Sequence, residues 1–186
     1  MASRTLRLVE MDRSTDVDVE ARCLAFLDDL SIPHQTVHHP PVYTVEEAKR
    51  LRCELPGAHV KNLFLCDRKK RSFFLLTALE SQSVSLKGLS RLLGINRGLR
   101  FANEGHLWDK LGVRPGAVTP FAVMNDVEGH VQMLLDENLK TMSPINAHPL
   151  HNAATTSIGL QDLLAFMDAC KHPPRWINLA ELADED

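Results

Sequence analysis

The sequence predicts an α+β fold: one domain in which helices flank a mixed β-sheet. Helical periodicities alternate with short β-type runs, and those runs occur in hairpins as well as singly, which favours a mixed sheet over a doubly wound parallel one. The 186 residues are 44% hydrophobic and contain no repeat and no long linker, so they fit one domain with a full core. We expect a single domain over residues 1–186, with a core over about 16–170 and a loosely docked acidic arm over 171–186.

The first half of the chain alternates between helix and strand signals. Thr44 and Glu47 have capping-box spacing, which predicts a helix start. The basic run 68–71 predicts a turn between two apolar strands. The expected elements are a helix over 16–30, a strand over 34–38, a helix beginning at Thr44, and a hairpin of strands 60–67 and 72–78.

Glycines and apolar runs divide the second half. Gly94 and Gly112 each follow a leucine-bearing segment, as glycines at helix C-termini do. The expected elements are a helix from Ser85 to Gly94, a strand over 99–102, a helix over 104–111, a constrained loop over 116–120, paired strands over 121–125 and 131–135, a polar loop over 146–156 and a helix over 160–170.

Composition argues against a membrane or secreted protein. No run approaches the roughly 20 apolar residues of a membrane-spanning helix, and the N-terminus lacks the apolar stretch of a secretory signal. The four cysteines form no C-x-x-C pair, which is typical of reduced thiols in a cytosolic protein. We therefore expect a cytoplasmic protein without membrane contact.

Charge is distributed unevenly along the chain. Residues 49–100 hold 12 Lys and Arg against three acidic residues, whereas the remainder holds 9 against 21. A basic segment within an acidic chain fits a polyanion-binding surface, but the run 68–71 could equally be a solvated hairpin tip. The candidate contacts are Arg68, Lys69, Lys70, Arg71, Lys87, Arg91 and Arg97.

Common catalytic motifs are missing. His38 and His39 are adjacent in a predicted strand, so they should point to opposite faces and not share a metal ion. His148 and His151 lack a third ligand of fitting spacing. There is no G-x-S-x-G elbow and no phosphate-binding glycine motif. We expect no metal and no cofactor.

Polar residues concentrate instead in the loop 146–156, and such loops commonly hold binding groups. Far upstream, Lys61 and Asn62 directly precede an apolar run. A lysine at a strand start, an adjacent amide and this loop could converge on a small anionic or carbonyl-bearing substrate. Taken alone, Lys61 is more often a solvated strand end, and the segment 116–120 could be simple turn chemistry.

Four segments, taken together, resemble a known family. They are His39-Pro-Pro-Val-Tyr-Thr-Val-Glu-Glu-Ala, Lys61-Asn-Leu-Phe-Leu, Gly116-Ala-Val-Thr-Pro120-Phe and His148-Pro-Leu-His-Asn152-Ala-Ala-Thr155. The residue types in these segments, and the order of the segments, are similar to those of the YbaK/ProX family of trans-editing deacylases. These enzymes are related to the editing domain inserted in bacterial prolyl-tRNA synthetases. The resemblance covers roughly residues 16–180 and is strongest to the ProX branch, which hydrolyses Ala-tRNA(Pro).

The resemblance implies an aminoacyl pocket near the mouth of a mixed sheet. Lys61 would hold the terminal adenosine phosphate or polarise the ester carbonyl, and Asn62 would orient the same group. His148 would hold an attacking water, with Asn152 and Thr155 behind it. The carbonyl and the α-amine of the substrate would be positioned by the backbone groups of Gly116, Ala117, Val118, Thr119 and Pro120.

The implied reaction is hydrolysis of an activated ester by positioning and oxyanion stabilisation, without a metal or a covalent nucleophile. The implied substrate is Ala-tRNA(Pro), with the tRNA(Pro) acceptor end on the basic segment; a prolyl-tRNA synthetase partner stays open, and we expect a monomer. Two alternatives remain: a deacylase for Cys-, Ser- or Thr-charged tRNA, or a non-catalytic relative that binds tRNA or a synthetase.

Overall fold

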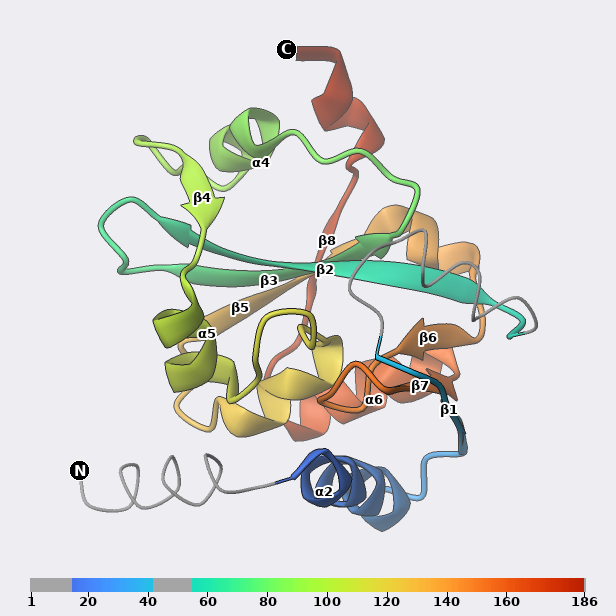
Figure 1. Cartoon of the computed structure of the whole chain (residues 1–186). Coiled ribbons are helices and arrows are strands. Elements are labelled where there is room, and N and C mark those ends of the chain that lie inside the picture. The colour runs from blue at the N-terminus through green and yellow to red at the C-terminus, as the bar shows by residue number, and fades with distance from the viewer. Residues whose placement is uncertain (1–14, 42–54, 186) are drawn as a thin grey trace.

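The computed structural model describes residues 15–41 and 55–185 (Figure 1). The helix expected to begin at Thr44 lies outside these ranges. None of the helices in the described ranges is long and apolar enough to span a membrane.

Local sequence signals explain where the helices begin and end. The Thr15 side chain accepts from the backbone N–H of Asp18, whose carboxylate accepts from the Thr15 N–H in return, so a capping box starts the first described helix. Gly112, at φ 62°, ends another. The helices are α2 (Asp16–Asp29), α4 (Leu86–Leu92), α5 (Glu104–Leu111) and α6 (Leu160–Ala169), with 3-10 helices η1 (Pro120–Asn125), η2 (Glu137–Thr141) and η3 (Ala180–Glu185).

In the described ranges, eight strands form a mixed sheet in the order β1-β7-β6-β2-β3-β5-β8, with β4 paired to β2. Three pairings are parallel (β2 with β6, β3 with β5 and β5 with β8), and the others are antiparallel. The predicted fold class is therefore confirmed. The strands are β1 (His34–His38), β2 (Ala58–Asp67), β3 (Phe73–Leu79), β4 (Leu99–Phe101), β5 (Val131–Asp136), β6 (Ile145–Ala147), β7 (Ala154–Ile158) and β8 (Arg175–Ile177).

Strand β2 joins two parts of the sheet. Its first two residues, 58–59, pair with β6, whereas residues 60–66 pair with β3. We call β1, β7, β6 and the start of β2 the small half-sheet, and the remaining strands the large half-sheet. The two parts carry different side chains, as described below.

Helices cover both faces of the sheet. Figure 1 shows α4 and η3 above the β2–β3 ribbons and α2, α5 and α6 below them. Alternate residues of β2 accordingly enter two hydrophobic clusters: Phe64 and Cys66 pack with residues of α2, α5 and α6, and Leu65 packs with residues of α4. We call these the α2 side and the α4 side of the sheet.

Three predicted segments differ from the structure. Residues 121–125 were expected to form a strand but lie in η1, because Thr119 caps the turn and Pro120 opens it; β5 pairs with β3 and β8 instead. The expected loop 146–156 is shorter, since β6 and β7 take both of its ends. The arm expected over 171–186 is partly integral to the sheet: it supplies β8, and Leu179 is fully buried.

Candidate functional site

The end of β6 meets β2 at the centre of the candidate site. The parallel register pairs Ala58 with Ile145 and His59 with Asn146. Because β6 ends at Ala147, continuing this register by two residues places His148 level with Lys61. Segments 87 residues apart in sequence are thus neighbours where β2 and β6 pair, two residues before Lys61 and His148.

Lys61 and Asn62, adjacent in β2, point to opposite faces. Asn62 lies on the α2 side, where its Oδ1 accepts a hydrogen bond from the hydroxyl of the fully buried Thr77 at 2.6 Å. Lys61 is partly exposed and alternates with it toward the other face. The predicted pair therefore does not act as one unit. Asn62 fixes the β2–β3 pairing, whereas Lys61 faces the same side of the sheet as His148 and Thr155.

Three polar side chains gather on the face of the small half-sheet that is turned away from α2. The hydroxyl of Thr155, 1% exposed, lies 2.9 Å from His39 Nε2. The ring centroids of His39 and His148 are 6.4 Å apart. His148 Nδ1 lies 3.0 Å from the Ala154 carbonyl oxygen, which can only accept, so Nδ1 carries a hydrogen and a neutral ring has Nε2 as its acceptor. The predicted residues Lys61, His148 and Thr155 thus share one face.

A glycine allows the two strands to meet here. Gly57 has φ 100°, and a Cβ at this position would overlap the Pro144 carbonyl group. The Ala58 N–H donates to that same carbonyl oxygen at 2.8 Å. Nearby, Asn146 is 1% exposed; its amide donates to the Pro56 carbonyl at 3.0 Å and its oxygen bonds the Ser157 hydroxyl. These contacts fix the backbone just before Lys61.

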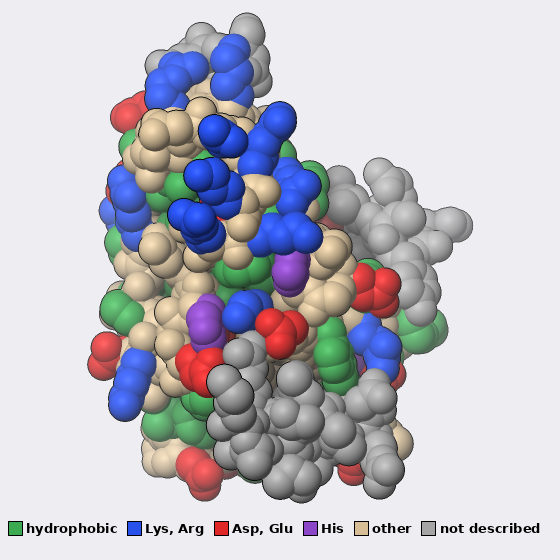
Figure 2. Space-filling view, turned by 90° about the vertical axis from the view of Figure 1, so that its left-hand side faces the viewer, with side chains coloured by type: hydrophobic (Ala, Val, Ile, Leu, Met, Phe, Trp, Pro, Cys, Tyr) green, Lys and Arg blue, Asp and Glu red, His purple; other side chains and the backbone are tan. Residues whose placement is uncertain are grey.

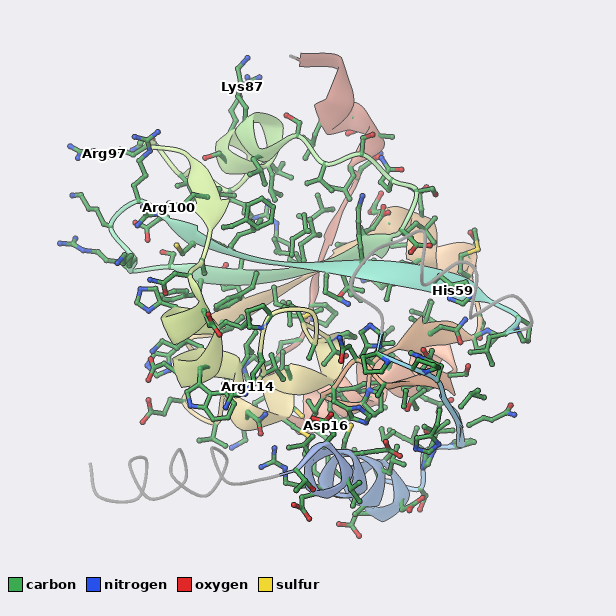
Figure 3. All side chains as sticks on the ribbon, viewed as in Figure 1. Asp16, His59, Lys87, Arg97, Arg100 and Arg114 are labelled. Atoms are coloured by element: carbon green, nitrogen blue, oxygen red, sulfur yellow. The ribbon has the colours of Figure 1, made fainter. Side chains whose placement is uncertain are left out.

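The predicted loop 116–120 lies beside the other end of the loop that carries His148. A cavity of about 250 Å³ separates α2, the end of α5 and these two loops, and Figure 3 shows Asp16 and Arg114 at its edge. Ala117 and Asn152, both predicted, line it. Its other lining residues are Asp16, Val19, Trp108, Gly112, Val113, Arg114, Pro115, Leu150 and His151.

The remaining residues of 116–120 have different exposures. Gly116 is exposed, and Val118 packs against the core. Thr119 is fully buried, and its hydroxyl accepts from the Phe121 N–H at 3.4 Å, while Pro120 is also buried. Their side chains therefore shape the loop, and backbone groups are what this segment can offer a ligand.

The two adjacent histidines at the end of β1, His38 and His39, point to opposite faces as the sequence predicts. His39 faces Thr155, whereas His38 faces α2 and lies 2.8 Å from Glu20. Sequence reasoning missed Glu20, because nothing in one helix indicates its partners on distant strands. Within residues 15–41 and 55–185, no three His, Cys, Asp or Glu side chains are grouped so that they could hold a metal ion.

The predicted basic residues lie on the large half-sheet and α4. Figure 2 shows Lys and Arg side chains gathered over the upper half of one face, and Figure 3 places Arg97 and Arg100 on the side of the β2–β3 turn, with Lys87 above them on α4. We call this the basic face. Its exposed members are Arg68, Lys69, Lys70, Arg71, Lys87, Arg91, Arg97 and Arg100.

A single carboxylate organises the tip of the basic face. Asp67 accepts hydrogen bonds from the backbone N–H groups of Lys69, Arg71 and Ser72, at 3.2, 2.6 and 3.0 Å. A hydrogen bond from the Ser72 backbone is the main cause that lowers the pKa of Asp67 below its usual range. The turn thus has a defined shape although its side chains are exposed.

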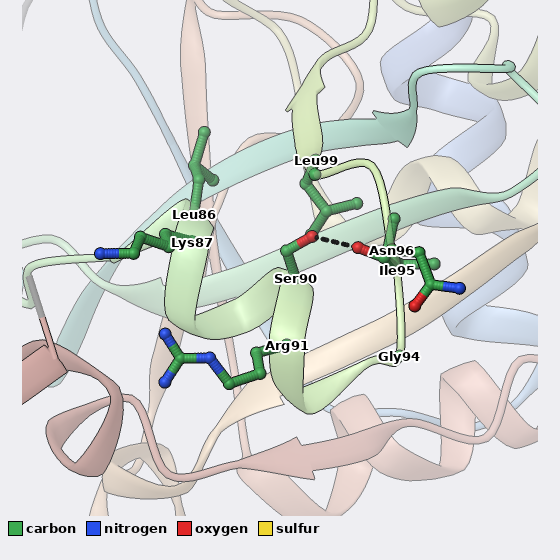
Figure 4. A pocket seen from close by; sticks show the side chains of 9 residues that line it. Leu86, Lys87, Ser90, Arg91, Gly94, Ile95, Asn96 and Leu99 are labelled. Carbon is green, nitrogen blue, oxygen red and sulfur yellow. Dashed lines mark hydrogen bonds between the residues drawn. The ribbon is translucent and has the colours of Figure 1, made fainter.

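Behind this tip, α4 and the segment leading into β4 enclose a shallow hollow of about 490 Å³ (Figure 4). Leu86, Ile95 and Leu99 form apolar walls, and Lys87 and Arg91 stand at the rim. The Ser90 hydroxyl donates to the Ile95 carbonyl at 3.0 Å and closes the floor.

A buried ion pair lies away from both regions. His172 Nε2 is 3.1 Å from Asp126, and both side chains are almost fully buried. Burial opposes ionisation of Asp126, but hydrogen bonds from His172 and from the Val131 backbone outweigh it and lower its pKa to about 2. Burial likewise opposes protonation of His172, but the Asp126 carboxylate raises its pKa. This pair joins the end of η1 to the segment after α6.

The chain is similar in sequence to known proteins. The model of the aminoacyl-tRNA editing domain family matches residues 39–166. A prolyl-tRNA editing protein, ProX, from Acetoanaerobium sticklandii is 38% identical over 148 residues, which cover 80% of this chain and 90% of that protein. The human putative prolyl-tRNA synthetase associated domain-containing protein 1 is 39% identical over 155 residues, or 82% of this chain and 91% of that protein.

A solved structure also shares the fold. A putative trans-editing enzyme for prolyl tRNA synthetase superposes with a TM-score of 0.68 at 20% identity, covering 89% of this chain and 97% of that one. At this identity the likeness concerns the fold alone, and it agrees with the predicted mixed sheet with flanking helices.

Proposed function

Because this chain belongs to the aminoacyl-tRNA editing domain family, we propose that it hydrolyses the ester bond of tRNA(Pro) mischarged with alanine. The family match and the ProX relative confirm the predicted family and the predicted class of enzyme, an aminoacyl-tRNA deacylase. The amino acid removed, the residues that act and the way the tRNA is bound are parts of the proposal.

The observation that carries the proposal is that Lys61, His148 and Thr155 lie on one face of the sheet, just beyond the residues where β2 and β6 pair. An aminoacyl ester is already activated, so its hydrolysis needs a positioned water and stabilisation of the developing oxyanion more than a strong nucleophile. A cation and an imidazole acceptor on one face suit these two tasks.

In the proposed reaction, water attacks the ester carbonyl carbon while His148 Nε2 accepts a hydrogen bond from it. Lys61 stabilises the charge that develops on the carbonyl oxygen. The bond from that carbon to the ribose oxygen then breaks, the ribose oxygen takes up a proton, and the free amino acid leaves. Thr155 and His39 hold the wall beside His148 through their 2.9 Å contact.

The geometry gives Asn62 a different task from the one implied by the resemblance. Its bond to Thr77 links β2 to β3 beneath Lys61, so we propose that Asn62 positions the strand and does not orient the ester. The basic face would receive the phosphates of the acceptor stem, because exposed Lys and Arg side chains bind a polyanion without needing exact geometry.

Selectivity for alanine over proline would rest on size. A close-packed pocket excludes a larger side chain by overlap, whereas an apolar pocket discriminates against a smaller one by only about 1–3 kcal/mol per methylene. Ala147 and Ala154 are buried on the α2 side of the small half-sheet. These two side chains therefore lie on the face opposite Lys61, His148 and Thr155.

The test is hydrolysis of tRNA(Pro) charged in turn with Ala, Pro, Ser and Cys. We expect rapid release of alanine and preservation of Pro-tRNA(Pro). Equal rates for Ala and Pro would contradict size exclusion, and a preference for Ser or Cys would replace the proposed substrate. Binding of the charged tRNAs without any hydrolysis would make the chain a non-catalytic relative.

A further inference from the structure

One carboxylate of helix α2, that of Glu20, contacts residues on the α2 side of the small half-sheet. Glu20 Oε1 lies 2.8 Å from His38 Nε2 on β1, and Oε2 lies 2.6 Å from His151 Nε2 in the loop between β6 and β7. The Glu20 side chain is only 13% exposed and His151 is 5% exposed. One carboxylate therefore joins three segments: α2, β1 and the loop 148–153.

The hydrogen-bond directions in this cluster are defined by its chemistry. An ionised carboxylate only accepts, so both imidazoles donate from Nε2. His151 Nδ1 accepts the Ala153 N–H at 3.2 Å, which fixes the tautomer of His151 and folds the loop around its ring. His38 carries its hydrogen on Nε2 in this contact, whereas a donating group in place of the carboxylate would favour the tautomer with the hydrogen on Nδ1.

Each histidine that Glu20 binds has a neighbour on the opposite face. His38 is followed by His39, which contacts Thr155, and His151 shares its short loop with His148. We propose that Glu20 is a positioning residue that sets His39 and His148 from behind the sheet. It touches neither the substrate face nor the reacting atoms, and acts through the two backbone segments that it ties together.

Two further observations support this assignment. Asp16 and Val19 of α2 line the same cavity as Ala117 and Asn152, so α2 backs both predicted site loops. In addition, the family match begins at residue 39. Glu20 therefore comes from a segment before the part of the chain that the family model matches, in the first described helix.

The kinetic test of this inference rests on the proposed function. It distinguishes the effect of the length of the Glu20 side chain from the effect of its charge. Glu20→Gln keeps the length of the side chain: its carbonyl can accept from His151 while its amide donates to the other tautomer of His38. Glu20→Asp keeps the charge but is one methylene too short to reach both rings. Asp28→Ala is the matched control, since Asp28 makes the equivalent α2–β1 contact with His34 at 3.2 Å, away from the loop 148–153.

We expect Glu20→Asp to lower kcat for the cognate charged tRNA roughly 10- to 100-fold, because a displacement of about 1 Å can have an effect of this size. KM should change by less than about threefold, since the tRNA contacts are elsewhere. Glu20→Gln and Asp28→Ala should stay within about threefold of wild type in both constants. Wild-type kcat in Glu20→Asp, or an equal loss in Asp28→Ala, would overturn the proposal.

A second readout does not depend on activity. In proton–nitrogen spectra of the imidazole rings, Glu20→Asp should move the ring signals of His39 and His148, and Asp28→Ala should leave them in place. Unmoved His39 and His148 signals in Glu20→Asp would overturn the proposal even if the enzyme lost activity. If the wild-type chain hydrolyses no charged tRNA, the proposed function fails, and these spectra still decide whether Glu20 positions the two rings.

Discussion

The two half-sheets use polar residues in opposite ways. On the small half-sheet and its adjoining loop, imidazoles have defined partners at 2.6 to 2.9 Å: His39 contacts the hydroxyl of the buried Thr155, and the buried His151 contacts the Glu20 carboxylate. The large half-sheet and α4 instead carry the basic face, whose Lys and Arg side chains are exposed to solvent (Figure 2).

The difference separates two tasks. Charge–charge attraction extends over roughly 8–10 Å at moderate salt, so an exposed basic surface can bind RNA with little precision. Stabilising a developing oxyanion requires donors within hydrogen-bond distance, which only a fixed framework supplies. Substitutions in the small half-sheet and at Lys61 should therefore lower kcat, and substitutions on the basic face should raise KM.

The largest expected effect is at Lys61. We predict that Lys61→Ala lowers kcat/KM for deacylation by roughly 100-fold or more, because losing one contact to a developing oxyanion costs about 3 kcal/mol. Single-turnover hydrolysis with saturating enzyme measures the chemical step. Lys69→Ala, a lysine at the tip of the same hairpin, is the control and should keep the wild-type single-turnover rate. A folded Lys61→Ala protein with normal turnover would remove Lys61 from the mechanism.

A smaller effect is expected at the tip of the basic face. Reversing the charges of Arg68, Lys69, Lys70 and Arg71 together should weaken tRNA binding about tenfold or more and flatten its dependence on salt, because each lost phosphate contact reduces the slope. Filter binding between low and moderate salt, with uncharged tRNA, measures both. The single-turnover rate at saturating enzyme should remain.

Single reversals provide a matched comparison. Lys69→Glu should weaken binding, whereas Lys171→Glu, an exposed lysine after α6, should not. Reversing Lys87, Arg91 and Arg97 locates the second part of the footprint, on α4 and the turn before β4. If none of these changes alters affinity or its salt dependence, the basic face is only a solvated surface, and the comparison between the half-sheets fails.

The sequence indicated much of the fold because its signals are local. Capping residues, glycines and helical periodicity located α2, α4, α5 and α6, and the basic turn located the β2–β3 hairpin. Residues 121–125 were predicted wrongly as a strand, because a short apolar run does not distinguish a buried strand from a buried helical turn. Only its tertiary surroundings decide, and Phe121 to Val123 are all buried.

The candidate site was less predictable, because its contacts join distant parts of the chain. Alternation along a strand correctly separates His38 from His39, and the same rule separates Lys61 from Asn62. Because Lys61 and Asn62 are adjacent in the motif, they were assigned a shared role in spite of this separation. The contact of Glu20 with His151 spans 131 residues and has no sequence signal.

The smallest expected effect on activity concerns the pair His172 and Asp126. This pair takes part neither in the proposed chemistry nor in the proposed tRNA binding. The pKa of His172 is raised, so its ion pair contributes fully below the unfolded value of about 6.5 and is lost as pH rises through the folded value. The pKa of Asp126 is lowered to about 2, so its contribution is lost only as pH falls through that value. Between these limits the pair should stabilise the fold most on the acidic side of neutrality.

We predict that His172→Gln lowers the free energy of unfolding by about 1–3 kcal/mol near pH 6, the range for a hydrogen bond to a charged group. The difference from wild type should shrink as pH rises through the folded pKa of His172. Urea unfolding at several pH values measures it. The single-turnover rate should stay at the wild-type value at a temperature where both proteins are folded, because the pair contacts neither Lys61 nor His148. A pH-independent difference would mean that His172 acts by packing, and a large loss of kcat would show that the site depends on this distant corner as much as on the small half-sheet.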